Sequence, residues 1–145
     1  MLIDTTYLLP LARIGVKYDL LKAIADGLID IAFSEIRVSL ISIFELQAKA
    51  VKLGIPPIHV VKAINVIFKS FKIIPFYEED IVKKAHEVNE LLDDYIDSII
   101  VATAITLNEE LITEDTIINK LRGILYKKYG LKVKRYKDLI KDTLY

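Results

Sequence analysis

The segment Asp97-Ser98-Ile99-Ile100-Val101-Ala102-Thr103-Ala104, followed by Leu111-Ile112-Thr113-Glu114-Asp115, decides the fold that this sequence predicts. The range 95–107 around the first part is apolar on nearly every side, which is typical of a helix buried against a sheet. Residues 111–113 form a short apolar run, which is typical of a buried strand. A buried helix that leads into a buried strand indicates an α/β protein with a parallel sheet.

The chain on either side of this segment repeats the alternation of short apolar runs and helical periods. Its 145 residues are enough for one domain with a hydrophobic core and too few for two, so we expect a single domain over 1–145. We expect strands at 1–4, 37–41, 72–76, 111–113 and 131–135, and helices at 6–14, 18–26, 42–53, 58–71, 78–92, 95–107, 116–122 and 136–144.

Composition excludes several classes of protein. Hydrophobic residues make up 53% of the chain, too many for a disordered protein. The absence of cysteine excludes disulfides and thiolate metal sites. The longest clean apolar runs, such as 99–105, are far shorter than the roughly 18 residues of a membrane span. An acid also stands at position 4, where a signal peptide would have basic residues. We therefore expect a soluble, cytoplasmic protein.

Twenty basic and twenty acidic residues cancel, so the net charge predicts no partner. The basic residues are nevertheless concentrated in the last quarter of the chain. Such a stretch could steer a phosphate backbone, and it could equally be a solvated face. The residues concerned are Lys120, Arg122, Lys127, Lys128, Lys132, Lys134, Arg135 and Lys137.

Four acids stand near the expected strand ends. Asp4 ends the first strand, and Asp115 follows the fourth. Glu45 lies in the first turn of the helix expected after the second strand, and Asp97 in the first turn of the buried helix. Ligands of open parallel sheets bind at the carboxyl ends of the strands. All four acids can therefore converge there, provided that their strands are neighbours.

Three of these acids also have explanations without chemistry. Ser42 and Glu45 match a capping box, in which the Glu45 carboxylate would reach back to the Ser42 backbone. Asp94 and Asp97 could be an N-cap and a first-turn acid that the helix dipole favours. Asp115 could cap the helix that follows it.

Asp4 is harder to explain in this way. It lies at the edge of an expected core, with Leu8 and Leu9 close behind, and no basic residue precedes Arg13. Burial of an unpaired carboxylate is costly, and a metal ion is one solution.

Four segments occur in an order and at a spacing that match a known family. They are Ile3-Asp4-Thr5-Thr6, Ser42-Ile43-Phe44-Glu45-Leu46, Asp97-Ser98-Ile99-Ile100-Val101-Ala102-Thr103-Ala104 and Leu111-Ile112-Thr113-Glu114-Asp115. Together they resemble the motifs of the PIN domain, a family of metal-dependent nucleases that includes the VapC-like ribonuclease toxins. The resemblance covers essentially the whole chain, and its last two segments are the most specific.

The resemblance implies a three-layer α/β/α fold with a central parallel sheet of about five strands, in which the first and fourth strands are adjacent. By position, the acidic quartet of the family falls on Asp4, Glu45, Asp97 and Asp115, which become the expected catalytic and metal-binding residues.

Further residues are expected to support this site. Thr5 and Ser42 lie where the family often has hydroxyl groups. Asn119 stands near a further acid of some members, and Thr6 where many members have Asn or Ser. The expected supporting residues are Thr5, Ser42, Thr113 and Asn119.

Mg²⁺ or Mn²⁺ is the expected cofactor, because a rim of carboxylates suits these ions better than Zn²⁺. His59 and His86 are the two histidines, and we expect them to be surface or packing residues. One or two ions held by the three aspartates, with the glutamate assisting, would activate a water molecule and stabilise charge on the scissile phosphate. Repulsion among the acids is expected to raise some of their pKa values.

The expected function is divalent-metal-dependent cleavage of RNA, as the toxin of a pair with a small antitoxin. A stand-alone RNA-processing nuclease and a PIN-like protein that binds RNA or a partner without cutting are the alternatives. A receiver-type signalling domain is disfavoured, because Asp4 stands alone after the first strand. We also expect a homodimer. Apolar positions that could serve a dimer or an antitoxin, or more simply the core, are Ile14, Val16, Leu20, Leu21, Val60, Val61 and Ile64.

Overall fold

Five short parallel strands form the centre of the protein in a computed structural model, which describes the backbone of residues 1–144 and the side chains of residues 1–140. The strands lie in the order β3-β2-β1-β4-β5, so the first strand is central and is adjacent to the fourth, as predicted. The strands are β1 (Leu2–Ile3), β2 (Arg37–Ser39), β3 (Lys72–Ile74), β4 (Leu111–Ile112) and β5 (Val133–Lys134).

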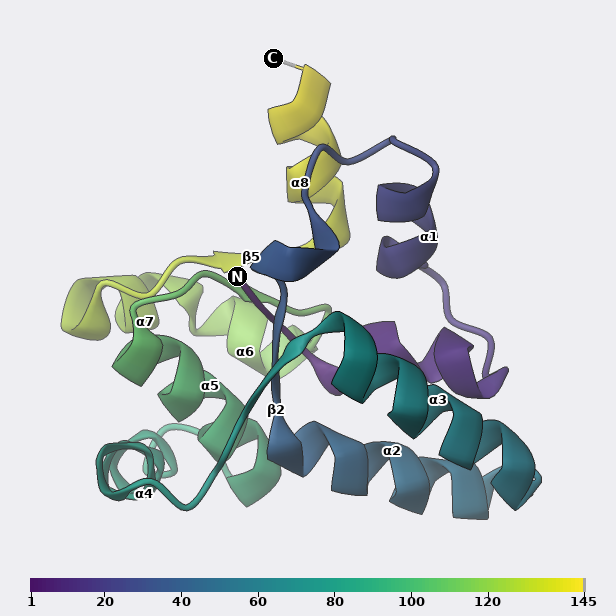
Figure 1. The fold of residues 1–145 in the computed structure, drawn as a ribbon. Helices are drawn as coiled ribbons and strands as arrows, with labels where there is room; N and C mark the ends of the chain where they lie inside the picture. The colour runs from purple at the N-terminus through teal and green to yellow at the C-terminus, as the bar shows by residue number, and fades with distance from the viewer. Residues whose placement is uncertain (145) are drawn as a thin grey trace.

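Helices connect and cover these strands (Figure 1). They are η1 (Thr5–Ala12), α1 (Leu20–Ala25), η2 (Phe33–Glu35), α2 (Leu40–Lys52), α3 (Pro57–Ser70), α4 (Glu79–Val88), α5 (Tyr95–Leu107), α6 (Thr116–Lys120), α7 (Arg122–Tyr129) and α8 (Tyr136–Leu144). The elements η1 and η2 are 3₁₀ helices.

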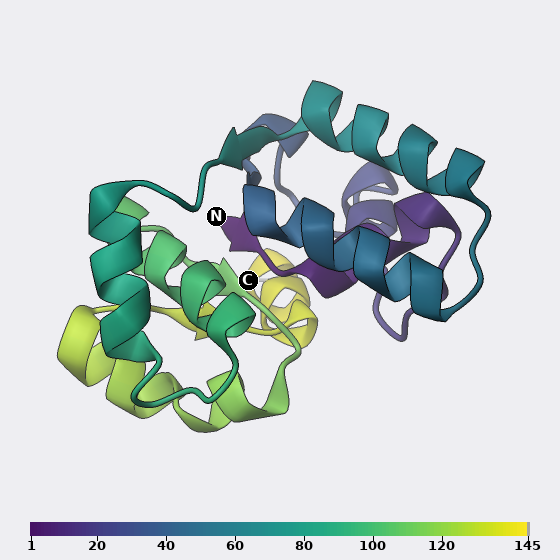
Figure 2. The same ribbon diagram turned by 90° about the horizontal axis from the view of Figure 1, so that it is seen from below.

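The sheet has a hydrophobic cluster on each face. Successive side chains of a strand point to opposite faces, and Leu2 and Leu111 accordingly belong to one cluster while Ile3 and Ile112 belong to another. Seen from below, α2 and α3 lie on one side of the strands and α4 and α5 on the other (Figure 2). The predicted three-layer α/β/α fold with a parallel sheet is therefore confirmed.

The helix that dominates the sequence pattern occupies the predicted range. α5 runs over Tyr95–Leu107, and most of its length from Ser98 to Ala104 is buried. Asp94 caps its first turn by accepting a hydrogen bond from the Asp97 backbone at 3.1 Å. Asn108, in the left-handed conformation at φ 54°, ends it. The first-turn position places the Asp97 side chain at the end of α5 that faces the carboxyl ends of the strands.

Several helices differ from the prediction. The helix predicted at 78–92 is α4, which ends at Val88, and the short helix η2 was not predicted. α2 begins at Leu40 with Ser39 as its N-cap, two residues before the predicted start. The helix predicted at 116–122 instead ends at Lys120, and the unpredicted helix α7 follows. Leu125 is the buried residue of α7, so its sequence lacks the apolar stripe by which an amphipathic helix is identified.

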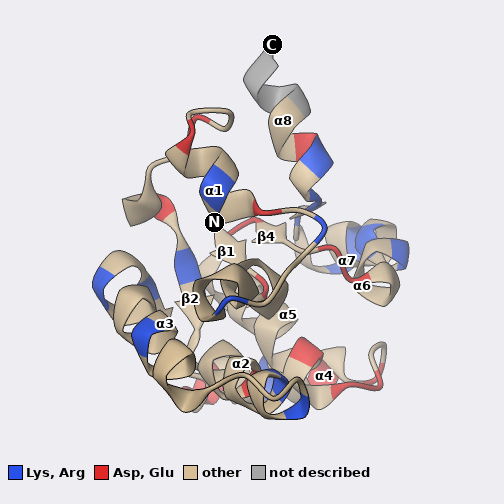
Figure 3. Cartoon of the chain, turned by 90° about the vertical axis from the view of Figure 1, so that its right-hand side faces the viewer, with Lys and Arg blue, Asp and Glu red and all other residues tan. Residues whose placement is uncertain are grey.

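The basic residues of the last quarter are spread over several elements, from α6 to α8. Figure 3 shows Lys and Arg on α7 and at the start of α8, as well as on α3. Lys128 pairs with Glu87 at 3.7 Å, and Lys134 with Glu110 at 3.4 Å.

Most of the apolar positions considered for a partner belong to the core. Ile14, Leu20 and Leu21 are buried, whereas Val61 is 52% exposed. Val16, Val60 and Ile64 are partly buried against the core. Among the described helices, none is long and apolar enough to cross a membrane. The single domain over 1–145 stays a prediction, and its last residue lies outside the described part.

Candidate metal and nuclease site

A cavity of about 410 Å³ opens at the carboxyl ends of the strands, and all four predicted acids line it. β1 and β4 meet at the point where the winding direction of the sheet reverses, which is where ligands of such sheets bind. The lining residues are Asp4, Thr5, Thr6, Leu9, Glu45, Lys49, Asp94, Asp97, Glu114, Asp115 and Thr116.

Asp4 lies at the base of this cavity and is 7% exposed. Its Oδ1 accepts a hydrogen bond from the Thr5 backbone at 2.7 Å, and its Oδ2 accepts one from the Thr113 hydroxyl at 2.7 Å. Its hydrogen-bond donors among the described residues are therefore neutral groups and not a cation. The pKa of Asp4 is raised from 3.8 to about 6, because burial, together with the charges of Glu45 and Asp115, raises it more than the two hydrogen bonds lower it.

Thr113 connects two of the acids from the end of β4. Its buried hydroxyl donates to the Asp4 carboxylate and accepts a hydrogen bond from the Asp115 backbone at 3.0 Å. This contact depends on the register of the sheet, in which Ile3 pairs with Ile112. Thr113 does not line the cavity; it orients a residue that does.

Asp97 stands opposite, at the start of α5. Its carboxylate accepts no hydrogen bond from the described residues, and it is partly buried. Burial raises its pKa from 3.8 to about 7, with further contributions from the charges of Asp4, Asp94, Asp115 and Glu45. The expected pKa increase is therefore found, although burial contributes more than the predicted repulsion.

Glu45 reaches the cavity from α2. The capping-box interpretation of this residue is wrong, because Ser39 is the N-cap and Ser42 lies inside the helix. Helix α2 starts earlier than its apolar pattern predicted, which moves Glu45 into the second turn. Its side chain is partly buried and lines the cavity together with Lys49, one turn further along.

Asp115 does cap a helix. Its Oδ1 accepts a hydrogen bond from the Ile118 backbone at 2.8 Å at the start of α6. It also lines the cavity. One carboxylate can serve both purposes, because two oxygens offer about four acceptor positions.

The other predicted supporting residues take different positions. Thr5 lines the cavity, and its buried hydroxyl has no hydrogen-bond partner. The Ser42 hydroxyl is also buried without a partner, but Ser42 does not line the cavity. Asn119 donates from its amide nitrogen to the backbone oxygens of Thr113 and Asp115, at 3.0 and 2.8 Å. It thereby fixes the turn after β4.

Sequence reasoning missed three charged residues of the cavity wall, namely Lys49, Asp94 and Glu114. Glu114 belongs to the segment 111–115, and its place between Thr113 and Asp115 is the signal that could have identified it. Its carboxylate accepts hydrogen bonds from the Tyr7 hydroxyl at 2.5 Å and from the Tyr136 backbone at 2.9 Å.

The two histidines lie elsewhere. His59 contacts Arg13 at 3.4 Å, and the ring of His86 packs edge-on against Tyr95 with 5.6 Å between centroids. Neither lines the cavity.

The donors of this cavity suit Mg²⁺ or Mn²⁺ by chemistry. Among the described residues, no three His, Asp or Glu side chains are close enough together to hold one metal ion. The acids are therefore spread around the wall. Carboxylate oxygens are nevertheless the preferred ligands of these ions, and Mg²⁺ usually binds through one or two carboxylates while it keeps several waters. The residues present fit such a hydrated ion.

Several solved structures resemble this fold. A toxin–antitoxin complex from Klebsiella pneumoniae is 26% identical, with a TM-score of 0.58 over 79% of this chain and 86% of that chain. VapBC2 from Rickettsia felis, bound to a DNA fragment from its promoter, is 17% identical, with a TM-score of 0.61 over 93% and 97%. FitAcB from Neisseria gonorrhoeae is 17% identical, with a TM-score of 0.62 over 92% and 95%. The last two likenesses show the fold alone.

Sequence comparison identifies the family. No curated protein matches the chain significantly. The family model of the PIN domain matches residues 1–124, a range that includes all four acids of the cavity. Members of this family are generally nucleases. The chain therefore belongs to the PIN domain family.

Proposed function

We propose that this protein is a divalent-metal-dependent endoribonuclease that uses Mg²⁺ or Mn²⁺ to hydrolyse phosphodiester bonds in RNA. The observation that carries the proposal is the convergence of Asp4, Glu45, Asp97 and Asp115 on one cavity from four separate elements. Burial and mutual repulsion raise the pKa values of Asp4 and Asp97, so this wall lacks sufficient positive charge of its own. Family membership supports nuclease chemistry.

One or two of the cavity aspartates, Asp4, Asp97 and Asp115, would bind a hydrated ion directly, and the remaining acids, including Glu45, would bind its waters or a second ion. A bound ion supplies a water of lowered pKa and neutralises charge that develops on the scissile phosphate. Thr113 keeps the Asp4 carboxylate in a fixed orientation. Lys49 places an ammonium group at the same wall, where it can contact a substrate phosphate. No covalent nucleophile is required.

We further propose that the protein acts in the cytoplasm as the toxin of a toxin–antitoxin pair and forms a homodimer. The similarity to a chain of the Klebsiella pneumoniae toxin–antitoxin complex supports such a partner. The match covers 86% of that chain. Co-expression with the product of the neighbouring upstream gene tests this role. A stable complex that suppresses RNA cleavage is expected, and size-exclusion chromatography with light scattering measures the stoichiometry.

Cleavage of a fluorescently labelled single-stranded RNA, with Mn²⁺ or with EDTA, tests the activity. Asp97→Asn removes a cavity carboxylate, and we expect it to reduce the rate at least ~10³-fold, an effect of several kcal/mol in metal stabilisation of charge. Asp93→Asn is the matched control, because Asp93 is exposed, lies four residues earlier and does not line the cavity.

The control variant should cleave at the wild-type rate. Cleavage that persists in EDTA, or an Asp97→Asn variant as active as Asp93→Asn, would refute the mechanism.

A further inference from the structure

A second cavity, of about 320 Å³, adjoins the acidic one. It is lined by Thr6, Lys17, Tyr18, Glu114, Arg135 and Lys137. Thr6 and Glu114 line both cavities, so the two share a wall. A polymer bound with one unit in the acidic cavity would therefore pass directly into the second.

The charge of the second cavity is opposite to that of the first. Lys17, Arg135 and Lys137 contribute three exposed cations. None of the three forms an ion pair with another described residue. Glu114 is the single acid of this lining, and its carboxylate already accepts hydrogen bonds from Tyr7 and Tyr136. The net charge of the lining is thus about two positive charges, next to a wall of carboxylates.

One ring of a stacked tyrosine pair contacts two of these cations, Lys17 and Lys137. The rings of Tyr18 and Tyr136 stack with 5.2 Å between centroids. The ammonium groups of Lys17 and Lys137 lie 5.4 and 5.8 Å from the centre of the Tyr18 ring. Segments more than a hundred residues apart therefore place two like charges over one ring. Cation–π attraction favours this arrangement, and an anion bound between the ammonium groups would relieve their repulsion.

We propose that this cavity, the basic subsite, binds a backbone phosphate of single-stranded RNA beside the scissile bond. The proposal rests on the proposed function and extends it by assigning a place to the substrate strand. Lys17, Arg135 and Lys137 bind the phosphate, and the stacked tyrosines hold the lysines in position. Repulsion between RNA and the acidic wall explains the need for such a subsite, because phosphates near four carboxylates require cations close by.

Single-stranded RNA fits this chemistry. Proteins that bind single strands combine a positively charged groove with aromatic rings, as found here. Contacts to phosphates carry no sequence information, so the basic subsite determines affinity and placement of the strand and not the choice of cleavage sequence.

Binding is measured apart from cleavage, by fluorescence anisotropy of a short labelled single-stranded RNA in the Asp97→Asn background with Mg²⁺. The test variant carries Lys17→Gln, Arg135→Gln and Lys137→Gln. Each lost phosphate contact should reduce the slope of log affinity against log salt by about 0.7, hence by up to about 2 for three contacts. The affinity should fall by roughly tenfold or more at physiological salt.

The matched control carries Lys62→Gln, Lys69→Gln and Lys72→Gln, which removes the same charge from exposed lysines of α3 and β3. It should bind RNA within about threefold of the parent, since distant surface charges are screened beyond roughly 10 Å. A charge-preserving variant with Lys17→Arg and Lys137→Arg should retain the parental salt slope. Equal melting temperatures verify that all variants are folded.

Equal losses of RNA affinity in the two Gln variants would overturn the basic subsite. Binding of an oligoglutamate peptide is measured in the same way. If the triple Gln variant at Lys17, Arg135 and Lys137 lost affinity for this peptide and not for RNA, the basic subsite would be overturned and the surface would be assigned to an acidic protein segment. Failure of the proposed function gives a different result. In that case the protein with intact Asp97 cuts no RNA with Mn²⁺, while binding still depends on Lys17, Arg135 and Lys137.

Discussion

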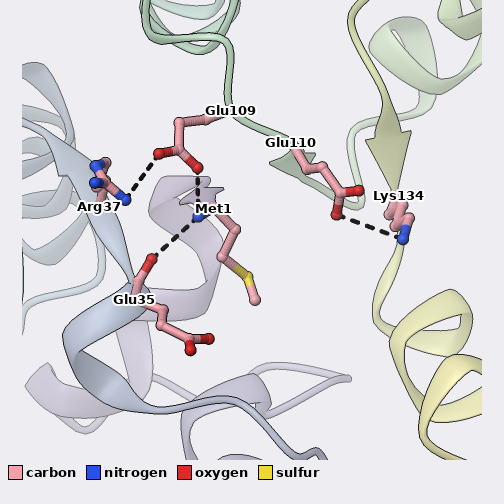
Figure 4. A network of polar contacts seen from close by, with 6 residues as sticks. All are labelled: Met1, Glu35, Arg37, Glu109, Glu110 and Lys134. Atoms are coloured by element: carbon pink, nitrogen blue, oxygen red, sulfur yellow. Dashed lines mark hydrogen bonds and ion pairs between the residues drawn. The ribbon is translucent and has the colours of Figure 1, made fainter.

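The acids at the two ends of the central sheet differ in whether they form ion pairs. At the amino ends of the strands, Glu109 pairs with Arg37 at 2.8 Å and with the Met1 amino group at 2.7 Å, while Glu110 pairs with Lys134 at 3.4 Å (Figure 4). At the carboxyl ends, the acids of the cavity have no ion pair with any described residue, and those that accept hydrogen bonds accept them from hydroxyl groups and backbone N–H groups.

The difference separates charges that form ion pairs within the fold from carboxylates that have no ion pair with any described residue. These ion pairs connect four neighbouring strands of the sheet, β2, β1, β4 and β5. The unpaired carboxylates lower stability, because burial and repulsion raise the pKa values of Asp4 and Asp97. Such a cost is typical of functional sites.

Metal binding is expected to have the largest effect on stability. This effect should depend on the acids at the carboxyl ends of the strands and not on the ion pairs at the amino ends. Mn²⁺ at a hundred times its dissociation constant should stabilise the protein by about 2.7 kcal/mol and raise its melting temperature by roughly 5–10 °C. Asp4→Asn should abolish the rise. Glu109→Gln, at the other end, should keep it, and a rise lost equally in both variants would contradict the comparison. Scanning calorimetry with and without Mn²⁺ measures it.

Removal of the hydroxyl group that orients Asp4 should lower the cleavage activity of the cavity, although this hydroxyl does not line the cavity itself. Thr113→Val deletes the hydrogen bond to Asp4 and should lower RNA cleavage by about 10–100-fold, because residues that orient ligands have effects of this size. It should also raise the pKa of Asp4 and move the pH profile of the rate upward. Thr103→Val is the control, because this buried hydroxyl bonds within its own helix to Ile99. A Thr113→Val variant with the rate and pH profile of Thr103→Val would show that Asp4 needs no such orientation.

The pH dependence of stability should report the unpaired acids. Asp97 keeps its proton up to about pH 7 in the folded state, whereas the unfolded chain releases it near 3.8. The free energy of unfolding should therefore fall as pH rises from about 4 to 7 and remain low above that range. Asp97→Asn should flatten this fall and stabilise the metal-free protein by about 1–2 kcal/mol at pH 8, a figure reduced for partial exposure. Urea unfolding across this pH range measures the change. Parallel curves for the variant and wild type would contradict it.

Breaking an ion pair at the amino ends of the strands should have the smallest effect. It should change the stability of the protein and not its cleavage rate. Arg37→Gln removes the ion pair with Glu109 and should cost about 0.5–1 kcal/mol in urea unfolding without altering cleavage. Lys83→Gln breaks a pair with Glu79 whose side chains are both more than 70% exposed, and it should cost close to nothing. A cleavage rate that falls with Arg37→Gln would mean that the two ends are coupled.

The sequence predicted the parts of this protein that have strong apolar periodicity. α5 lies at its predicted bounds because Ser98 to Ala104 are apolar or small on every face. The adjacency of β1 and β4 could not be deduced from spacing, and it came from the resemblance to the PIN domain. α7 was missed, because Leu125 supplies its buried contact without a repeating pattern.

The candidate site was predicted as a set of residues and not as a geometry. Asp4, Glu45, Asp97 and Asp115 do share one cavity, but the role of Glu45 depended on a helix start that the pattern placed two residues late. Lys49 was missed because only tertiary structure brings it to the wall, whereas Glu114 has a local signal in its place between Thr113 and Asp115. The apolar neighbours of Asp4 indicated its burial, but the sequence did not predict that burial would contribute more than repulsion to the pKa increase of Asp4 and Asp97.

The hydrogen bond between Asp4 and Thr113 also determines how late in synthesis the cavity can form, because it joins segments that are far apart in the chain. The two residues are 109 positions apart, and Asp115 follows Thr113 by two. At about 5–20 residues per second, a ribosome needs roughly 5–20 s to proceed from the first of these acids to the last. A nascent chain therefore carries Asp4 for that whole interval without the β4 partner that completes the cavity, so the chemistry proposed for the cavity is not available until Asp115 has been added.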